Sequence, residues 1–267
     1  MGKLTNYATN KWLNHILEGS AFTKPTALWF AYSTTDFTAT GAGGSEPVGN
    51  NYGRTTCLVK FATPAANRIV SNDGDIVAAQ ASGSQGTIAY WALFDAETDG
   101  NCLCYGAFAT GKAVGANQTL KVLTGEIDIS IPTGGFTDYL ANGMLDHTFV
   151  SGGDEFTQPT IYMALATTTS FGDAGAWTNE TSTAGGTLYA RIASAWTVSG
   201  TGATNNGALT FPVAGASWGN QVAWALADGD TEGAGNMLFY HAKAIGTIGA
   251  DDQVNIPDGD LDFTFTG

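Results

Sequence analysis

The chain has 267 residues and a formal net charge of −14, so it lacks the basic patch that binding to nucleic-acid phosphates requires. Charged residues make up only 13%, against about a quarter in an average globular protein. Glycine, threonine, alanine and serine are abundant instead. This composition favours short strands joined by tight turns, with surfaces that other subunits can cover.

The chain opens with the polar stretch Met1–Asn6, which has no apolar core of the kind found in signal peptides. Asn6 also breaks the myristoylation pattern, which needs Ser or Thr at that place. No apolar run reaches the roughly 18 residues of a membrane helix. We therefore expect a cytosolically made chain with no membrane partner.

A helix is predicted over residues 4–19, with Thr5 as its N-cap and Gly19 as its end. A second helix is predicted over residues 136–149, with Thr137 as N-cap and Gly152 as the stop. Apolar residues recur at helical spacing in both segments. We expect each helix to pack on one side of its own domain.

A strand after each helix begins behind a proline, at Pro25 and Pro159, where a missing backbone donor costs least. A Gly-, Thr- and Asp-rich loop follows each strand, over residues 36–50 and 169–187. These are the longest irregular stretches of the chain, so a variable contact surface would lie there. Within them the candidate partner-contact residues are Asp36, Glu46, Trp177 and Asn179.

The strands that follow are also repeated. Residues 88–94 and 222–226 are almost continuously apolar, which predicts strands buried on both faces. Trp29, Trp91, Trp196 and Trp224 lie in apolar strands and are interpreted as core residues, whereas Trp177 lies in a loop. Residues 114–131 return as 248–265, at a constant offset of 134.

A repeat of this length, present twice, indicates a tandem duplication of a domain. Each copy is predicted to hold one helix and about six or seven short strands. The fold class is therefore mostly β, with two tandem β-sandwich domains of jelly-roll or Ig-like type, each with an N-terminal helix. We place copy one at residues 1–131, a short linker at 132–135 and copy two at 136–267, and expect the domains to lie side by side.

Three cysteines leave no complete pairing, and Cys102 and Cys104 correspond to Met237 and Phe239 in copy two. Cys102 and Cys104 are therefore interpreted as core residues on one face of a strand, Cys57 stands alone, and the chain is expected to be free of disulfides. His15 and His147 occupy equivalent helical positions, so an ordering role is favoured over catalysis.

Carboxylates are the candidate groups for a catalytic or metal site. Glu126 and Asp128 could form a glycosidase pair, but Asp260 and Asp262 repeat them in copy two, which favours a solvated strand face. The steps at residues 73–75, 228–230 and 258–260 each read Asp-Gly-Asp. They could donate to Ca²⁺, but a turn is the favoured interpretation. No catalytic residue, cofactor site or metal site is assigned.

Several motifs carry a resemblance to a known family. They include the helix from Leu4 to His15, the segment Ala21–Pro25, and Tyr52–Arg54. Residues 91–95 and 100–106 continue it. This pattern resembles the β-sandwich structural proteins of tailed-bacteriophage virions, often described as structural or tail-fibre proteins. Copy two departs more, with Phe136 for Leu4 and Ala190 for Gly53.

The resemblance implies a non-enzymatic virion component that contacts other virion proteins. A capsid decoration or cement protein is the first expectation, because a low-charge tandem suits a symmetric lattice and a trimer would present six similar faces. The alternative is a tail-fibre or neck-fibre component that recognises the host surface. A sugar-cleaving enzyme is the third possibility.

Overall fold

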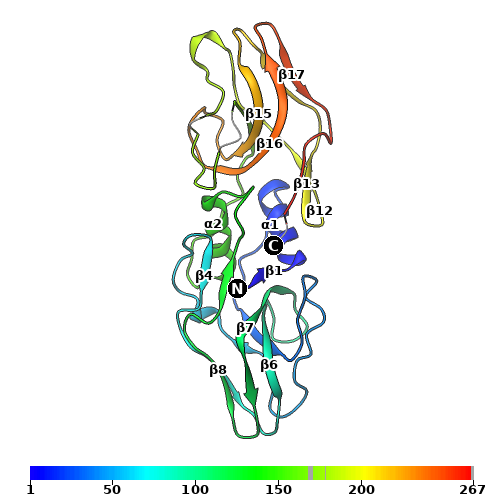
Figure 1. Ribbon diagram of the computed structural model, residues 1–267, viewed down its shortest axis with the longest axis vertical. Helices are drawn as coiled ribbons and strands as arrows, with labels where there is room; N and C mark the ends of the chain where they lie inside the picture. Colours follow the sequence, from blue (N-terminus) through cyan, green and yellow to red (C-terminus); the bar gives the residue numbers. More distant parts are fainter. Residues whose placement is uncertain (168–170, 178, 266–267) are drawn as a thin grey trace.

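The computed structural model describes residues 1–167, 171–177 and 179–265. The molecule is elongated, with one β domain at each end of its long axis and both helices between them (Figure 1). The two copies therefore lie end to end. The expectation that they lie side by side is wrong, because both helices fill the space between the sandwiches.

Copy one contains helix α1 (Asn6–Leu17) and open sheets that pack in a sandwich-like manner. Its five-stranded sheet has the order β1-β7-β6-β2-β3, and the pairs β4-β9 and β5-β8 complete it. The strands are β1 (Lys3–Leu4), β2 (Trp29–Ser33), β3 (Thr55–Thr56), β4 (Ile69–Ser71), β5 (Ile76–Gln80), β6 (Gly86–Phe94), β7 (Cys102–Val114), β8 (Thr119–Val122) and β9 (Asp128–Ser130), with a 3-10 helix η1 (Leu58–Lys60).

Copy two repeats this plan around helix α2 (Asp138–Phe149). Its sheets have the orders β11-β10-β15-β16, β12-β13-β18 and β14-β17. The strands are β10 (Tyr162–Ala166), β11 (Ile192–Ala193), β12 (Trp196–Ser199), β13 (Gly202–Asn205), β14 (Leu209–Val213), β15 (Gly219–Ala227), β16 (Met237–Ile248), β17 (Gln253–Ile256) and β18 (Asp262–Thr264), with a 3-10 helix η2 (Ala184–Gly186). The mostly β, tandem two-domain prediction is confirmed, and the described residues hold more strands than expected.

The two predicted N-caps are confirmed and do more than cap. Thr5 Oγ1 accepts from the N–H of Ala8, and Thr137 Oγ1 accepts from the N–H of Leu140. Each hydroxyl also donates at 2.5 Å to a carbonyl of its own long strand, that of Cys102 in β7 or Met237 in β16. The start of each helix is thereby fixed to the sheet of its own domain.

The central strands β6 and β15 are covered on both faces. Trp91 and Leu93 of β6 face the main core, whereas Ala92 and Phe94 face a smaller outer cluster. Trp224 and Leu226 of β15 face the main core in the same way. The prediction from the continuous apolar runs is therefore confirmed. Trp29, expected in the core, is only half-buried and packs on the outer cluster.

The cysteines are all buried and free, as expected. Cys102 and Cys104 do not share a face, however, because Cys102 lies in the outer cluster and Cys104 in the main core. A register shift between Leu93 and Phe94 inserts one unpaired residue into β7 at this point. Such a bulge breaks the alternation on which the prediction rested.

The helices pack against both domains. Helix α1 contacts β1 and β7 of copy one, and also β12 and β13 of copy two. Helix α2 contacts β16 of copy two and β4 of copy one. The expectation that each helix packs on its own sandwich is therefore incomplete. A single cluster of buried side chains runs from copy one through the helices into copy two.

A reciprocal histidine pair holds the centre of this interface. His15 Nδ1 accepts from the N–H of Phe22, and its Nε2 donates to the carbonyl of Phe156 at 2.7 Å. His147 Nδ1 accepts from the N–H of Phe156, and its Nε2 donates to the carbonyl of Phe22 at 2.8 Å. The rings stack with centroids 5.2 Å apart. The expected ordering role is thus played between the domains.

The linker is held by Arg68, which is buried and has a positive φ of 66°. Its guanidinium donates to the carbonyls of Ile131, Pro132 and Phe136. It also forms an ion pair with Asp138, 3.2 Å away. This clamp gives the linker one path between the domains, which agrees with the restricted hinge expected from its shortness.

Candidate functional site

The two long loops were expected to carry contacts, and the structure shows what most of their residues do. Residues 169, 170 and 178 of the second loop lie outside the described residues. Phe37 of the first loop and Phe171 of the second are buried in the outer clusters over β6 and β15. Both loops are therefore anchored as covers for the outer faces of the central strands.

Glu46 lies inside an ion-pair network of copy one. Its carboxylate is 2.8 Å from the Arg54 guanidinium and accepts from the Tyr52 hydroxyl. The guanidinium lies over the Phe94 ring, 3.5 Å from the centroid, and also donates to the carbonyls of Ala96 and Asp99. Burial, reinforced by the Glu46 carboxylate, raises the pKa of Tyr52 above its ordinary range. Glu46 thus fastens the loop to the sheet.

Copy two repeats the network with Glu180, Arg191 and Tyr189. Arg191 Nε is 2.7 Å from Glu180, and both side chains are almost fully buried. Trp177 covers this pair, with its ring centroid 4.0 Å from the guanidinium, and donates from Nε1 to the carbonyl of Gly235. Trp177 is therefore half-buried and packs on the domain, although part of its surface stays accessible.

The other two predicted residues lie in ordinary loop positions. Asp36 is exposed, and its carboxylate accepts from the N–H of Thr38 at 3.4 Å. The carbonyl of Asn179 accepts from the N–H of Thr167. Asp36 and Glu46 belong to one domain, and Trp177 and Asn179 to the other, so the four do not form one site. Their role in partner contact stays a prediction.

Sequence reasoning missed two exposed apolar side chains. Val48, in the first loop, is 94% exposed, and Leu188, directly after the second loop, is 64% exposed. The loop end at Asn50 donates to the carbonyl of Ser84, and Thr187 accepts from Gly215, so each loop end joins neighbouring turns. The sequence signal that could have identified them is an apolar residue inside a Gly-rich stretch.

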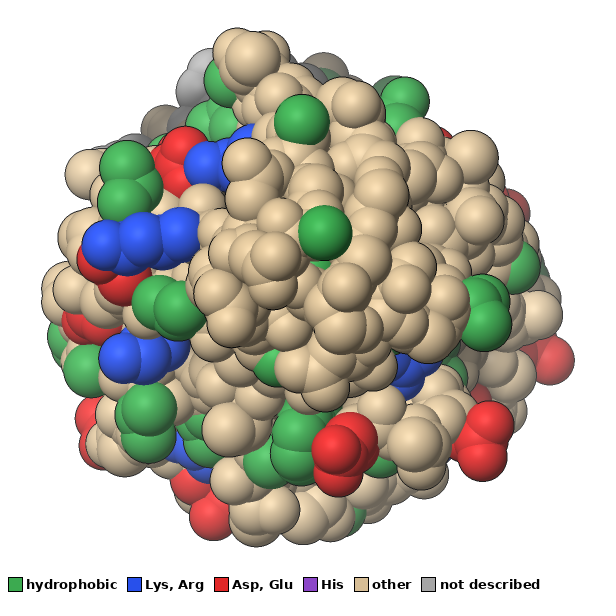
Figure 2. Space-filling view, turned by 90° about the horizontal axis from the view of Figure 1, so that it is seen from below, with side chains coloured by type: hydrophobic (Ala, Val, Ile, Leu, Met, Phe, Trp, Pro, Cys, Tyr) green, Lys and Arg blue, Asp and Glu red, His purple; other side chains and the backbone are tan. Residues whose placement is uncertain are grey.

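The view onto the copy-one end shows mostly uncharged surface (Figure 2). Hydrophobic side chains are scattered singly across it, and most charged side chains lie toward its margin. Such a surface offers backbone, amide and hydroxyl groups for hydrogen bonding. It suits contact with a neutral polar partner more than with a charged one.

The carboxylates considered for catalysis have structural partners. Glu126 is 2.8 Å from Lys112 Nζ, and Asp128 accepts from the Ser71 hydroxyl at 2.5 Å. Burial acts to raise the pKa of Glu126, but hydrogen bonds from Lys112 and the Leu123 N–H outweigh it and the pKa is lowered. Asp260 likewise pairs with Lys243, 3.3 Å away. A glycosidase acid needs a raised pKa, so Glu126 does not suit that role.

Possible metal ligands and reactive thiols were the other candidates, and the described ranges show how these side chains are placed. No group of three or more His, Cys, Asp or Glu side chains there is arranged to hold a metal. The Asp-Gly-Asp steps act in turns: Asp73 accepts from Ala62, Asp228 from Asn236, and Asp258 from Gly207. Burial raises the pKa of Cys57 and of Cys102 to about 12, so neither thiol ionises near neutral pH.

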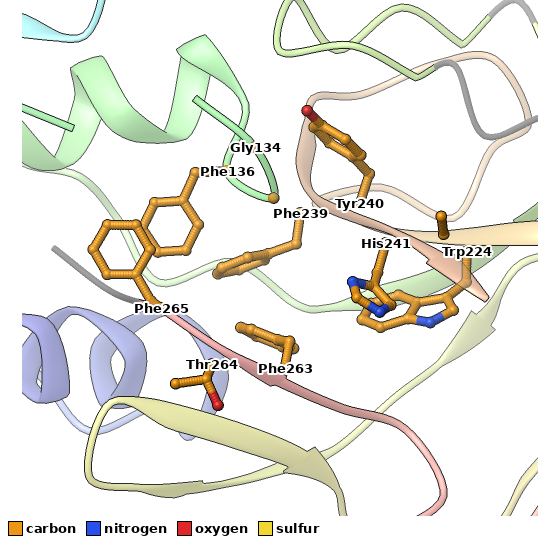
Figure 3. A pocket seen from close by; sticks show the side chains of 11 residues that line it. Gly134, Phe136, Trp224, Phe239, Tyr240, His241, Phe263, Thr264 and Phe265 are labelled. Atoms are coloured by element: carbon orange, nitrogen blue, oxygen red, sulfur yellow. The ribbon is translucent and has the colours of Figure 1, made fainter. Parts of the chain in front are cut away.

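One apolar opening stands out, in copy two. It has a volume of about 310 Å³ and is lined mainly by aromatic side chains on β15 and β16, on and next to β18, and directly after the linker (Figure 3). We call this groove the slot and define it by Phe136, Trp224, Phe239, Phe263 and Phe265. Tyr240, His241 and Thr264 also line the slot.

Within the described ranges, no helix is long and apolar enough to cross a membrane. No curated protein matches the chain. A family model described as Podophage GP4 fiber I protein gp80 matches residues 3–130 and again residues 135–264. The two matches cover nearly the whole chain and confirm the resemblance to phage structural proteins and the tandem duplication. The chain therefore belongs to this family of phage fibre proteins.

Proposed function

We propose that the protein is a non-enzymatic component of a phage fibre, a stiff two-domain segment that presents one of its ends toward the host cell surface. The family supports a structural virion component of the fibre kind. The observation that carries the rest of the proposal is the end-to-end arrangement of two domains around one continuous core (Figure 1).

Stiffness follows from how the domains are joined. Bending at the interface would open the buried cluster that runs through both helices. It would also break the reciprocal bonds of His15 and His147 and leave buried carbonyls of Phe22 and Phe156 unpaired. Each such loss costs about 1–3 kcal/mol, so a bent form would be rare. A fibre segment needs this property to hold its tip away from the particle.

The capsid decoration or cement role, our first expectation, has no support from the family, and the fibre alternative fits better. The argument for decoration rested on low charge and tandem symmetry, and both suit a packed fibre equally well. We retain association with other virion proteins as part of the proposal. A homo-oligomer such as a trimer, synthesis in the host cytoplasm and the domain limits at residues 131 and 136 stay predictions.

Adsorption competition tests host recognition. Purified protein added to host cells should lower phage adsorption in a dose-dependent way. Val48→Asp in copy one and Leu188→Asp in copy two are tested separately, and the variant in the host-facing domain should lose most of this competition, because a buried charge at a contact opposes binding. Val59→Asp is the matched control, since Val59 is 70% exposed but lies in η1, two residues before Phe61, whose carbonyl accepts from the N–H of Ser151 in copy two. Equal behaviour of all variants would refute recognition by either end.

A further inference from the structure

The two copies differ strongly in charge. Residues 1–131 contain 8 Lys and Arg against 10 Asp and Glu, which gives a net charge of −2. Residues 136–267 contain 2 Lys and Arg against 14 Asp and Glu, which gives a net charge of −12. Because the copies lie at opposite ends of the long axis, the molecule has a nearly neutral end and an acidic end (Figure 1).

Both cations of copy two are already paired with carboxylates of the same copy. Arg191 Nε lies 2.7 Å from Glu180, and the Arg191 side chain is fully buried. Lys243 Nζ lies 3.3 Å from Asp260. The remaining carboxylates of copy two therefore outnumber any cation that the same copy could supply, and an approaching group meets an excess of negative charge.

Each copy ends in an equivalent turn, far from the helices. Strand β7 pairs with β1 through Cys104 and runs outward to Val114, and β16 pairs with Phe136 through Phe239 and runs outward to Ile248. The turn that follows each strand lies at an end of the molecule (Figure 1). We call residues 115–118 and 249–252 the end turns.

The backbone of the two end turns is the same. The Asn117 N–H donates to the Ala81 carbonyl at 2.7 Å, and the Asp251 N–H donates to the Ala214 carbonyl at 2.7 Å. Asn117 has a φ of 63° and Asp251 a φ of 67°. Asn and Asp both tolerate this left-handed conformation, so either residue fits either turn.

The fourth residue of each end turn also has the same role. The Gly115 N–H donates to the side-chain oxygen of Gln118 at 2.7 Å, and the Gly249 N–H donates to the carboxylate of Asp252 at 2.7 Å. An amide oxygen in one copy thus replaces a carboxylate oxygen in the other. The end turns differ in charge and keep one geometry.

The segments beside the end turns carry almost no charge. They are residues 45–51 and 80–86 in copy one, and residues 182–188 and 213–219 in copy two. Glu46 is the one charged residue among them, and it pairs with Arg54 at 2.8 Å. The side chains of Asp251 and Asp252 are exposed, as are those of the copy-one turn. The copy-one end therefore presents mostly uncharged polar groups (Figure 2).

This difference bears on which end meets a cell. The outer surface of a bacterium is rich in phosphate and carboxylate groups, and charges of one sign brought together at a contact oppose binding. Such repulsion acts over about 8 Å at physiological salt. We propose that copy one is the host-facing domain, that its end contacts the cell surface through amide, hydroxyl and backbone groups, and that copy two points toward the particle. This inference rests on the proposed function and adds which end carries the recognition.

Exchange of the end turns tests the inference, with binding of the purified protein to host cells as the measurement. Asn117→Asp with Gln118→Asp gives copy one the carboxylates of copy two, and should lower the affinity about tenfold at physiological salt. Asp251→Asn with Asp252→Gln is the matched reverse exchange, and should leave the affinity unchanged. The backbone of each turn already accepts both kinds of side chain in this molecule, so both variants should fold.

Salt separates repulsion from the loss of two amide groups. The loss caused by the copy-one exchange should shrink as salt is raised, because exposed charges are then screened. In the adsorption competition, the inference predicts that Val48→Asp loses activity and that Leu188→Asp keeps it.

A label on intact particles shows the orientation directly. Ala116→Cys and Ala250→Cys place a thiol on the equivalent exposed position of each end turn. The three natural cysteines are buried, so a thiol-reactive gold label should mark the new position. We expect gold on Ala116→Cys at the free end of the fibre and gold on Ala250→Cys toward the particle.

Several results would overturn the inference while the fibre proposal stands. They are a change of affinity confined to the copy-two exchange, equal affinity of both exchanges and the unchanged protein, a loss that salt does not reduce, or gold from Ala250→Cys at the free end. Absence of any binding by the unchanged protein would instead refute host recognition itself, and this inference would fall with it.

Discussion

The two domains share one architecture and differ in how they are closed. In copy one the N-terminal segment bonds both β7 and β9 and covers Trp91. In copy two the linker bonds β16 alone, and the groove beside Trp224 stays open. In copy two the contacts of Arg68 with Ile131, Pro132 and Phe136 hold the linker toward copy one. Duplication has therefore produced one domain in which the first segment joins both sheets, and one in which, among the described residues, it reaches β16 only.

The ion-pair networks give the largest expected contrast between the copies. Glu180→Ala should cost about 3–5 kcal/mol of stability, because it leaves the Arg191 charge buried without its partner. Glu46→Ala is the matched change in copy one, where the Arg54 and Glu46 side chains are 12% and 24% exposed. Water can reach Arg54, so the cost should be about 1–2 kcal/mol. Urea unfolding measures both.

Equal losses of stability for Glu46→Ala and Glu180→Ala would show that the deeper burial of the copy-two ion pair does not increase its contribution. The differences between the two domains would then lie in the slot and in the charge of their end turns.

The packing of the first segment against Trp91 in copy one depends on Gly2. Gly2→Val should destabilise the protein by about 1–3 kcal/mol, because the side chain would overlap the Trp91 ring and expel the segment. Lys3→Val, at an exposed position of the same strand, should change stability by no more than about 0.5 kcal/mol. Thermal unfolding of the two variants provides the measurement. Equal stability of both would mean that the segment is not packed as described.

The histidine pair makes the interface between the copies sensitive to acid. Burial lowers the pKa of His147, and protonation of its Nδ1 would oppose the N–H of Phe156. The unfolded chain binds this proton more readily, so the contribution is complete above the unfolded pKa of about 6.5. It is lost as the pH falls through the lower folded pKa.

His147→Asn should cost roughly 1–2 kcal/mol at pH 7 through the lost hydrogen bonds. It should also flatten the pH dependence of stability below pH 6.5, measured as urea midpoints from pH 7.5 to 5. An identical slope in the variant and the unchanged protein would assign the acid sensitivity to other groups.

The helix caps offer the smallest effect and the clearest symmetry. Thr5→Ala and Thr137→Ala should each cost about 1 kcal/mol, since each removes a cap bond and a donor to a strand carbonyl. The two losses should agree, because the local geometry is the same in both copies. A large difference would show that the copies diverge even at their shared starts.

Much of the fold could be predicted because it depends on local patterns. Thr5 and Thr137 stand directly before helical periodicity, and the apolar runs of β6 and β15 indicate strands covered on both faces. The offset of 134 between residues 114–131 and 248–265 reveals the duplication by itself.

What could not be predicted depends on contacts between distant segments. Helical periodicity shows that α1 has an apolar face, but not that β12 of the other domain covers part of it. A single bulge separated Cys102 from Cys104. The slot depends on Arg68, an isolated arginine whose contacts with Ile131 and Phe136 have no local signature. The sequence suggests Glu46 and Trp177 as partner-contact residues of the loops, whereas an ion pair holds Glu46 and a cation–π contact holds Trp177 to its own domain.

The most direct test of the account is the position of the protein on the intact particle. Antibodies against the purified chain, coupled to gold and viewed on virions by electron microscopy, should label thin fibres and leave the head surface unlabelled. One end of each labelled fibre should be attached to the particle, and the other end should be free. Gold distributed evenly over the capsid would contradict the account and restore the decoration role.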